Sequence, residues 1–175
     1  MKHGDDIEFD LLKDRVAVEM KRYFGQDFKR IAHASRVARY AEQLVKEEKG
    51  DMAVVLIAAY LHDIGIKDAE RKYGSNEARY QEQQGPPVAR EILGRLGAAS
   101  ELIEEVCDII GHHHHPRNQE TANFKILYDA DLIVNIEENH KASSIDPEKL
   151  SGIIAKSFLT ESGGKLAQKI LLAQS

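Results

Sequence analysis

Apolar positions recur every three or four residues along most of the chain, the spacing typical of helices that bury one face. The clearest stripe lies between positions 27 and 49, and its members are Ile31, Ala34, Val37, Ala38, Ala41, Leu44 and Val45. A more uniformly apolar run follows Asp51, which is suited to cap a helix, and we expect that helix to end near Gly65. Since no segment alternates apolar and polar residues convincingly, the pattern predicts an all-α fold.

Proline, glycine and capping residues divide the rest of the chain into further helices. Pro86 and Pro87 are expected to open one helix, because proline is tolerated in a first turn, and Gly97 closes it. Other expected starts or breaks are Ser100, Thr121, Asp146–Pro147 and Gly163–Gly164. The polar segment 67–85 is expected to be partly helical or a mobile crossover. We predict one compact domain over residues 1–175, with about seven to nine helices.

The composition narrows the class of protein. With 175 residues, 42% hydrophobic and 30% charged, the chain fits one soluble globular domain. Its net charge of −5 argues against binding a nucleic-acid backbone. Cys107 is the only cysteine, which suits a reducing cytosol, and neither a signal peptide nor a membrane span is apparent in the sequence. We therefore expect a cytoplasmic protein.

Metal-ligand side chains stand inside the apolar stripes at three places. They are His33, the adjacent His62 and Asp63, and Asp131. Burying a lone carboxylate costs on the order of several kcal/mol, and a shared divalent cation would offset that cost. Taken singly, a histidine on an apolar face is more often a hydrogen-bonded core residue. Asp129 is expected to be an exposed helix carboxylate.

The order of these residues resembles a known signature. His33, then His62–Asp63 in the string LHDIG, then Asp131, each in a predicted helix, is similar to the H…HD…D motif of the HD-domain superfamily of metal-dependent phosphohydrolases. The resemblance spans about residues 28–136, and we expect the helices of 146–175 to pack on this core. It implies that His33, His62, Asp63 and Asp131 ligate a divalent metal, which could be Mn, Fe, Co, Ni or Zn. Asp63 would orient or deprotonate the attacking water, with His62 as its catalytic partner.

The string GHHHHP at 111–116 resembles the His-His pair of family members that hold two metals. In those members another histidine precedes a Pro-led helix, but here that position is Gln84. The second site is therefore incomplete, and we expect one ion rather than two. His113 and His114 would bind the substrate phosphate or a weak second ion.

Polar residues near the motifs are candidates for substrate contacts. They are Lys67, Arg36 and Gln84, although a solvated surface role for each stays open. Position 66 is Ile where the 5′-nucleotidase branch of the family has Glu, and the marks of the guanosine-polyphosphate hydrolases are also absent.

We expect an enzyme that hydrolyses a phosphomonoester or phosphoanhydride of a nucleotide or related small molecule by metal-activated water. One alternative is a regulatory HD module that binds metal and nucleotide without turnover. A di-iron oxygenase is a third hypothesis, disfavoured by Gln84. The partner would be a small phosphorylated substrate, with no nucleic acid and no membrane. The apolar C-terminal helix leaves a homodimer open.

Overall fold

The computed structural model describes the backbone of residues 2–172 and the side chains of residues 8–172, and this part of the chain contains no strand. In chain order the helices are α1 (Lys2–Phe24), α2 (Phe28–Glu47), α3 (Met52–Leu61), α4 (Ile66–Tyr73), α5 (Ala78–Arg95), α6 (Ser100–Ile110), α7 (Ala122–Ala142), α8 (Pro147–Ser157) and α9 (Glu161–Ala167), followed by a short π-helix, η1 (Gln168–Leu172). The all-α prediction is confirmed. None of the described helices has both the length and the apolarity that a membrane crossing requires.

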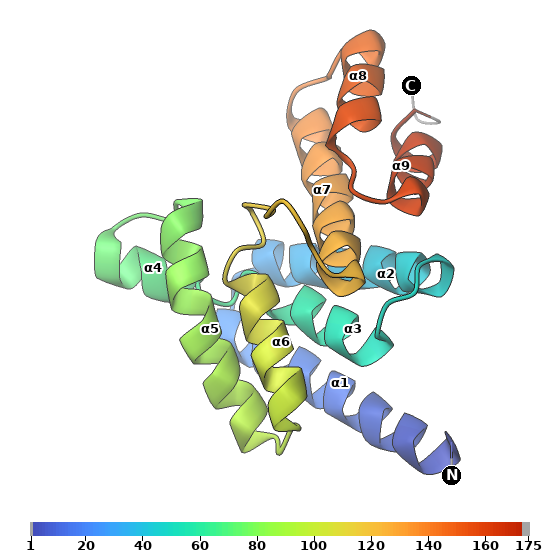
Figure 1. The fold of residues 1–175 in the computed structure, drawn as a ribbon. Coiled ribbons are helices and arrows are strands. Elements are labelled where there is room, and N and C mark those ends of the chain that lie inside the picture. Colours follow the sequence, from blue (N-terminus) through green and yellow to red (C-terminus); the bar gives the residue numbers. More distant parts are fainter. Residues whose placement is uncertain (1, 173–175) are drawn as a thin grey trace.

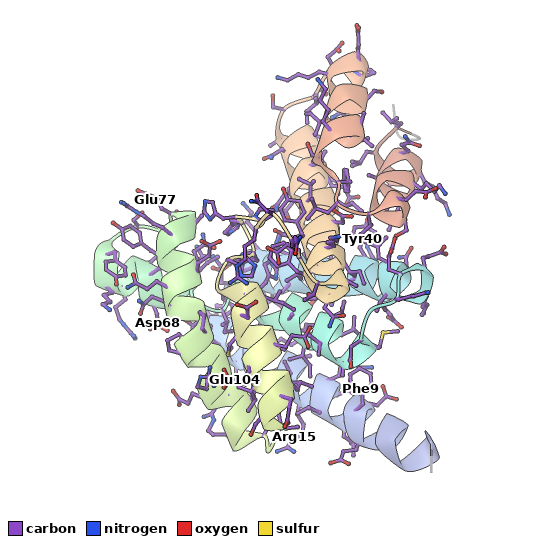
Figure 2. The ribbon with its side chains drawn as sticks, viewed as in Figure 1. Phe9, Arg15, Tyr40, Asp68, Glu77 and Glu104 are labelled. Atoms are coloured by element: carbon purple, nitrogen blue, oxygen red, sulfur yellow. The ribbon has the colours of Figure 1, made fainter. Side chains whose placement is uncertain are left out.

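The core lies where α2, α3 and α7 meet. α2 packs along α3, and α7 contacts both of them (Figure 1). Of the apolar stripe predicted on α2, all members except the half-buried Ile31 are buried. α5 and α6 form a neighbouring helix pair, joined at their surface by the Arg90–Glu104 ion pair (Figure 2). At the far end of α7, α8 and α9 stand beside it (Figure 1).

Two predicted helix starts have different outcomes. The Asp51 carboxylate accepts hydrogen bonds from the backbone amides of Ala53 and Val54, as expected for the cap of α3. The helix predicted to start at Ser100 is confirmed as α6, although Ala99 rather than Ser100 occupies the capping position. α3 itself ends at Leu61, so the residues up to Gly65 form a turn.

The prolines do not open a helix as predicted. α5 begins at Ala78, and Pro86 and Pro87 lie in its interior, where proline usually costs about 3 kcal/mol. Tertiary packing holds the helix together there. A Cβ on Gly65 would lie 2.8 Å from the Gly85 Cα, so two glycine backbones meet at this point. The turn that carries His62 and Asp63 can approach α5 so closely because Gly65 lacks a side chain.

Asp129 is fully buried, contrary to the prediction of an exposed carboxylate. Its oxygens accept hydrogen bonds from the backbone amides of Leu159 and Thr160, each at 2.8 Å, and from the Thr160 hydroxyl at 2.6 Å. Gly163 lies inside α9, where a Cβ would come within 2.8 Å of the Asp129 Cβ. Asp129 therefore fastens the C-terminal helices to α7, and Gly163 permits that contact without breaking α9.

Candidate metal centre

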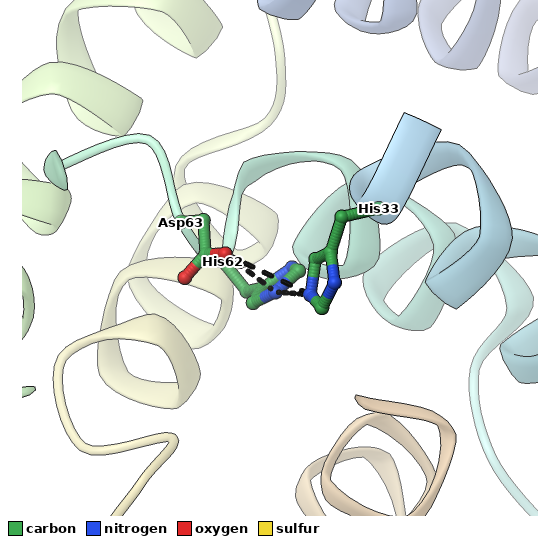
Figure 3. Close-up of side chains that lie close together, drawn as sticks. All are labelled: His33, His62 and Asp63. Atoms are coloured by element: carbon green, nitrogen blue, oxygen red, sulfur yellow. Dashed lines mark hydrogen bonds and ion pairs between the residues drawn. The ribbon is translucent and has the colours of Figure 1, made fainter. Parts of the chain in front are cut away.

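Three separate elements bring the four motif residues together. His33 comes from α2, His62 and Asp63 from the turn after α3, and Asp131 from α7. His33 Nε2 lies 3.0 Å from Asp131 Oδ1 and 3.3 Å from His62 Nε2. His62 Nε2 lies 3.3 Å from Asp63 Oδ2 (Figure 3). The structure thus places all four predicted ligands around one point.

The helix end explains how neighbouring residues share this point. Side chains at adjacent positions of a helix diverge by about 100°, so His62 and Asp63 could not converge in mid-helix. α3 has already ended at Leu61, and the following turn directs both side chains to the same side (Figure 3). Gly65 lets that turn press against α5. The string LHDIG therefore encodes both the ligands and the bend that presents them.

The imidazole rings are oriented by their outer nitrogens. His62 Nδ1 donates to the Ala59 carbonyl at 2.8 Å, and His113 Nδ1 donates to the Ile110 carbonyl at 2.8 Å. Because a carbonyl oxygen can only accept, Nδ1 carries the proton in both rings. Each Nε2 is then left to face the other ligands, which is the arrangement in which histidine binds a metal.

Burial and charge oppose each other at this centre. His33, His62 and Asp131 are all buried. Burial lowers the pKa of His62, but the charges of Asp63 and Asp131 outweigh it and hold that pKa well above its ordinary value. Burial likewise tends to raise the pKa of Asp63, yet the charge of His62 holds it well below its usual range. The two carboxylates thus attract positive charge into a buried space, which suits a divalent cation.

The inner histidines of the run join this centre from the loop after α6. His113 is 2% exposed, and its Nε2 lies 3.6 Å from Asp63 Oδ1 with no hydrogen-bond partner among the described residues. Ligand atoms of Asp63, His113 and His114 lie close enough together to share an ion. Burial, followed by the charge of His113, lowers the pKa of His114 to about 4, which leaves its ring neutral at pH 7. Asp63 therefore stands between two groups of histidines.

The outer histidines face elsewhere. His112 Nδ1 donates to the Asp108 carbonyl at 2.6 Å, its Nε2 lies 3.0 Å from a Glu120 oxygen, and its ring stacks on Phe124. His115 pairs with Glu82 at 2.9 Å. These contacts tie the loop to α6, α7 and α5. The run is thus divided into two histidines that face the centre and two that hold the loop in place.

The candidates for substrate contacts engage other parts of the chain. Lys67 donates to the Tyr23 carbonyl at 2.9 Å, and Gln84 donates to the Tyr73 hydroxyl at 3.4 Å. Arg36 forms ion pairs with Glu137 and Glu138 on α7. A substrate role for these three residues stays a prediction.

The sequence reasoning missed Glu138. Its Oε1 lies 3.3 Å from His33 Nδ1, on the side of the ring away from the centre. The available signal was its position seven residues after Asp131, because two turns of a helix return to the same face.

The comparisons with known proteins agree with this geometry. The HD-domain family matches residues 30–136, which include all four motif residues. The chain belongs to the HD-domain family. No curated protein sequence matches it significantly.

Solved structures share the HD fold. A predicted HD superfamily hydrolase from an uncultured Thermotogales bacterium is 26% identical, with a TM-score of 0.64 over 88% of this chain and 82% of that one. Bacillus subtilis YpgQ is 18% identical, with a TM-score of 0.64 over 92% and 88% of the two chains. The Lin1889 protein from Listeria innocua is 19% identical, with a TM-score of 0.61 over 93% and 92%. At these identities, the last two show the fold alone.

Proposed function

We propose that this HD protein is a metal-dependent hydrolase of a phosphomonoester or phosphoanhydride in a small, nucleotide-type molecule. The position of Asp63 carries the proposal. Its Oδ2 lies among the nitrogens of His33 and His62, at 3.7 and 3.3 Å, while its Oδ1 faces His113 at 3.6 Å. One carboxylate thus joins the candidate metal ligands His33 and His62 to His113, on whose side we place the substrate.

The residues present fit a divalent metal. His33, His62, Asp63 and Asp131 supply imidazole nitrogens and carboxylate oxygens, the mixture that Mn, Fe, Co, Ni and Zn accept. The buried His113 Nε2, without a hydrogen-bond partner among the described residues, also calls for a ligand or water beside it. A bound divalent ion supplies a water of lowered pKa and polarises a phosphoryl oxygen.

The residues of the chain then have distinct tasks. Asp63 Oδ1 faces His113 rather than His33 or His62. It can therefore orient a water or accept its proton. His62 is fixed by the Ala59 carbonyl, which keeps its Nε2 aimed at the centre. The His113 Nε2 can accept a hydrogen bond from that water or, when protonated, donate one to a phosphoryl oxygen. The buried setting strengthens each of these interactions.

The nucleotide class rests on the family resemblance, so the test includes other phosphate esters. Hydrolysis is measured across nucleoside mono-, di- and triphosphates and non-nucleotide esters, with Mn²⁺ or, without oxygen, Fe²⁺. The wild type is compared with Asp63→Asn and with Asp10→Asn, which removes an exposed carboxylate on α1. We expect Asp63→Asn to lower turnover by on the order of 10³-fold or more, because it loses a metal ligand and the base together. The control should match the wild type.

Other outcomes separate the alternatives. Equal turnover in Asp63→Asn would contradict the mechanism. Metal-dependent nucleotide binding by the wild type, without hydrolysis of any compound, would identify a regulatory module. Oxygen consumption by the Fe²⁺ form would identify an oxygenase.

A further inference from the structure

His33 differs from His62 and His113 in what holds its ring. His62 and His113 each donate Nδ1–H to a backbone carbonyl three residues earlier in the chain. The His33 Nδ1 instead faces a side chain, with the Oε1 of Glu138 at 3.3 Å. An ordinary turn of backbone thus orients two rings, whereas a carboxylate from another helix orients the third.

One helix contacts both nitrogens of the His33 ring. Asp131 Oδ1 lies 3.0 Å from Nε2, and Glu138 Oε1 lies 3.3 Å from Nδ1. The two carboxylates stand seven positions apart on α7, about two helical turns, so they project from the same face. α7 therefore contacts the imidazole at Nε2, which faces the centre, and at Nδ1, which faces away from it.

Glu138 is itself held in place. Arg36, one turn after His33 on α2, lies 3.2 Å from Glu138 Oε1 and also pairs with Glu137. Glu137 is buried and accepts a hydrogen bond of 3.1 Å from the hydroxyl of Tyr40, which lies on α2 beside α7 (Figure 2). The Glu138 carboxylate is thus fixed by a guanidinium that a second carboxylate anchors.

We propose that Glu138 is a positioning residue that fixes the ring of His33 for metal binding, with Arg36 holding Glu138 in place. The inference rests on the proposed metal-dependent function. A carboxylate that accepts Nδ1–H sets the orientation of the ring and makes its Nε2 a stronger donor. Arg36 acts here on the metal centre from outside, instead of on the substrate.

The first test measures the affinity for Mn²⁺ by calorimetric titration of the metal-free full chain. Loss of such a partner usually weakens metal binding by about 10- to 100-fold, and we expect that loss in Glu138→Ala. Glu138→Gln retains an acceptor oxygen and should recover much of the affinity. Glu70→Gln is the matched control, because Glu70 of α4 forms an ion pair with Arg30 of α2 but has no part in the Arg36–Glu138 arrangement. It should bind Mn²⁺ as the wild type does.

The second readout is the Nδ1–H proton of His33 in the Zn²⁺-loaded protein, observed by nitrogen-resolved NMR. It should be shifted downfield and protected from exchange in the wild type and in Glu70→Gln, and should be lost to exchange in Glu138→Ala. Equal losses of affinity in the Glu70 and Glu138 variants would overturn the inference, since Glu138 would then be only one half of an interhelical ion pair, as Glu70 is. An unchanged Nδ1–H signal in Glu138→Ala would overturn it as well.

These readouts are independent of turnover. If the protein binds Mn²⁺ and Zn²⁺ as described but hydrolyses nothing, the proposed function fails while the role of Glu138 stands. If Glu138→Ala binds and hydrolyses as the wild type does, the role of Glu138 fails while the function stands.

Discussion

The two groups of ligands that meet at Asp63 are built differently. In the first, His33, His62 and Asp131 come from two helices and a helix end, and each ring has a partner on both nitrogens. In the second, His113 and His114 come from a loop after α6, and the His113 Nε2 has no hydrogen-bond partner among the described residues. The His114 Nε2 lies 3.3 Å from the side-chain amide oxygen of Gln81.

Because their side chains are held differently, we expect the two groups to have different functions. Ligands held by packed helices lose little freedom when an ion binds, so the first group is preorganised for a metal. The second group has two imidazoles and shares its carboxylate with the first. The buried His113 Nε2, which has no hydrogen-bond partner among the described residues, is better suited to bind a water or a phosphoryl oxygen. We therefore expect one tightly held ion, with the substrate received on the His113 side.

The largest effect is expected from His62→Ala, which removes the ring at the middle of the first group. His62 contacts His33, Asp63 and Asp131, so its loss leaves two buried carboxylates with less compensation. Metal affinity and turnover should both fall by on the order of 10³-fold. The measurements are calorimetric metal binding and steady-state hydrolysis, with circular dichroism to verify the helical fold. Retention of tight metal binding would show that the first group is not the metal site.

A smaller and more selective effect is expected from His113→Ala. Turnover should fall by about 10- to 100-fold, because a polar group beside the reacting atoms is lost. Affinity for the metal should stay close to that of the wild type. His115→Ala is the comparison from the same run, since it removes an exposed imidazole that holds the loop through Glu82 and so measures the effect of the loop alone. If His113→Ala instead loses the metal, the two groups form one metal site, and the claim that they have different functions is contradicted.

The smallest effect is expected from Gln84→His, which restores the histidine that two-metal relatives carry. The Gln84 side chain donates a hydrogen bond to the Tyr73 hydroxyl on α4. The number of ions bound per chain, measured by elemental analysis after equilibrium dialysis, should stay at that of the wild type. A rise by one ion would show that the second group lacks nothing but this ligand.

The sequence was sufficient to predict which residues converge in the first group, because their signal is local. A histidine or aspartate inside an apolar helical stripe is costly to bury, and that cost is visible without a structure. The fold class followed from the same periodicity. The spacing between Glu138 and Asp131 indicates that both lie on one helix face. The ion pair between Glu138 and Arg36 could not be predicted in this way, because the two residues are 102 positions apart.

The wrong predictions concern features that depend on contacts between distant parts of the chain. Asp129 stands two positions from Asp131 and so points away from it on α7. Its partners are amide groups 30 and 31 residues later, which no local pattern reveals. Pro86 and Pro87 lie inside a helix that packs against α4 and α6, so the local rule for proline misplaced the start of that helix. Local chemistry predicted the site, whereas tertiary packing set the helix ends.

The central claim is that a single ion in the first group supports hydrolysis. The most direct test adds Mn²⁺ stepwise to the metal-free protein and follows bound metal and hydrolysis of its best substrate in the same samples. The account predicts that turnover rises in proportion to bound metal and reaches its plateau at one ion per chain. Turnover that starts only after a second ion binds, or that does not depend on bound metal, would contradict it.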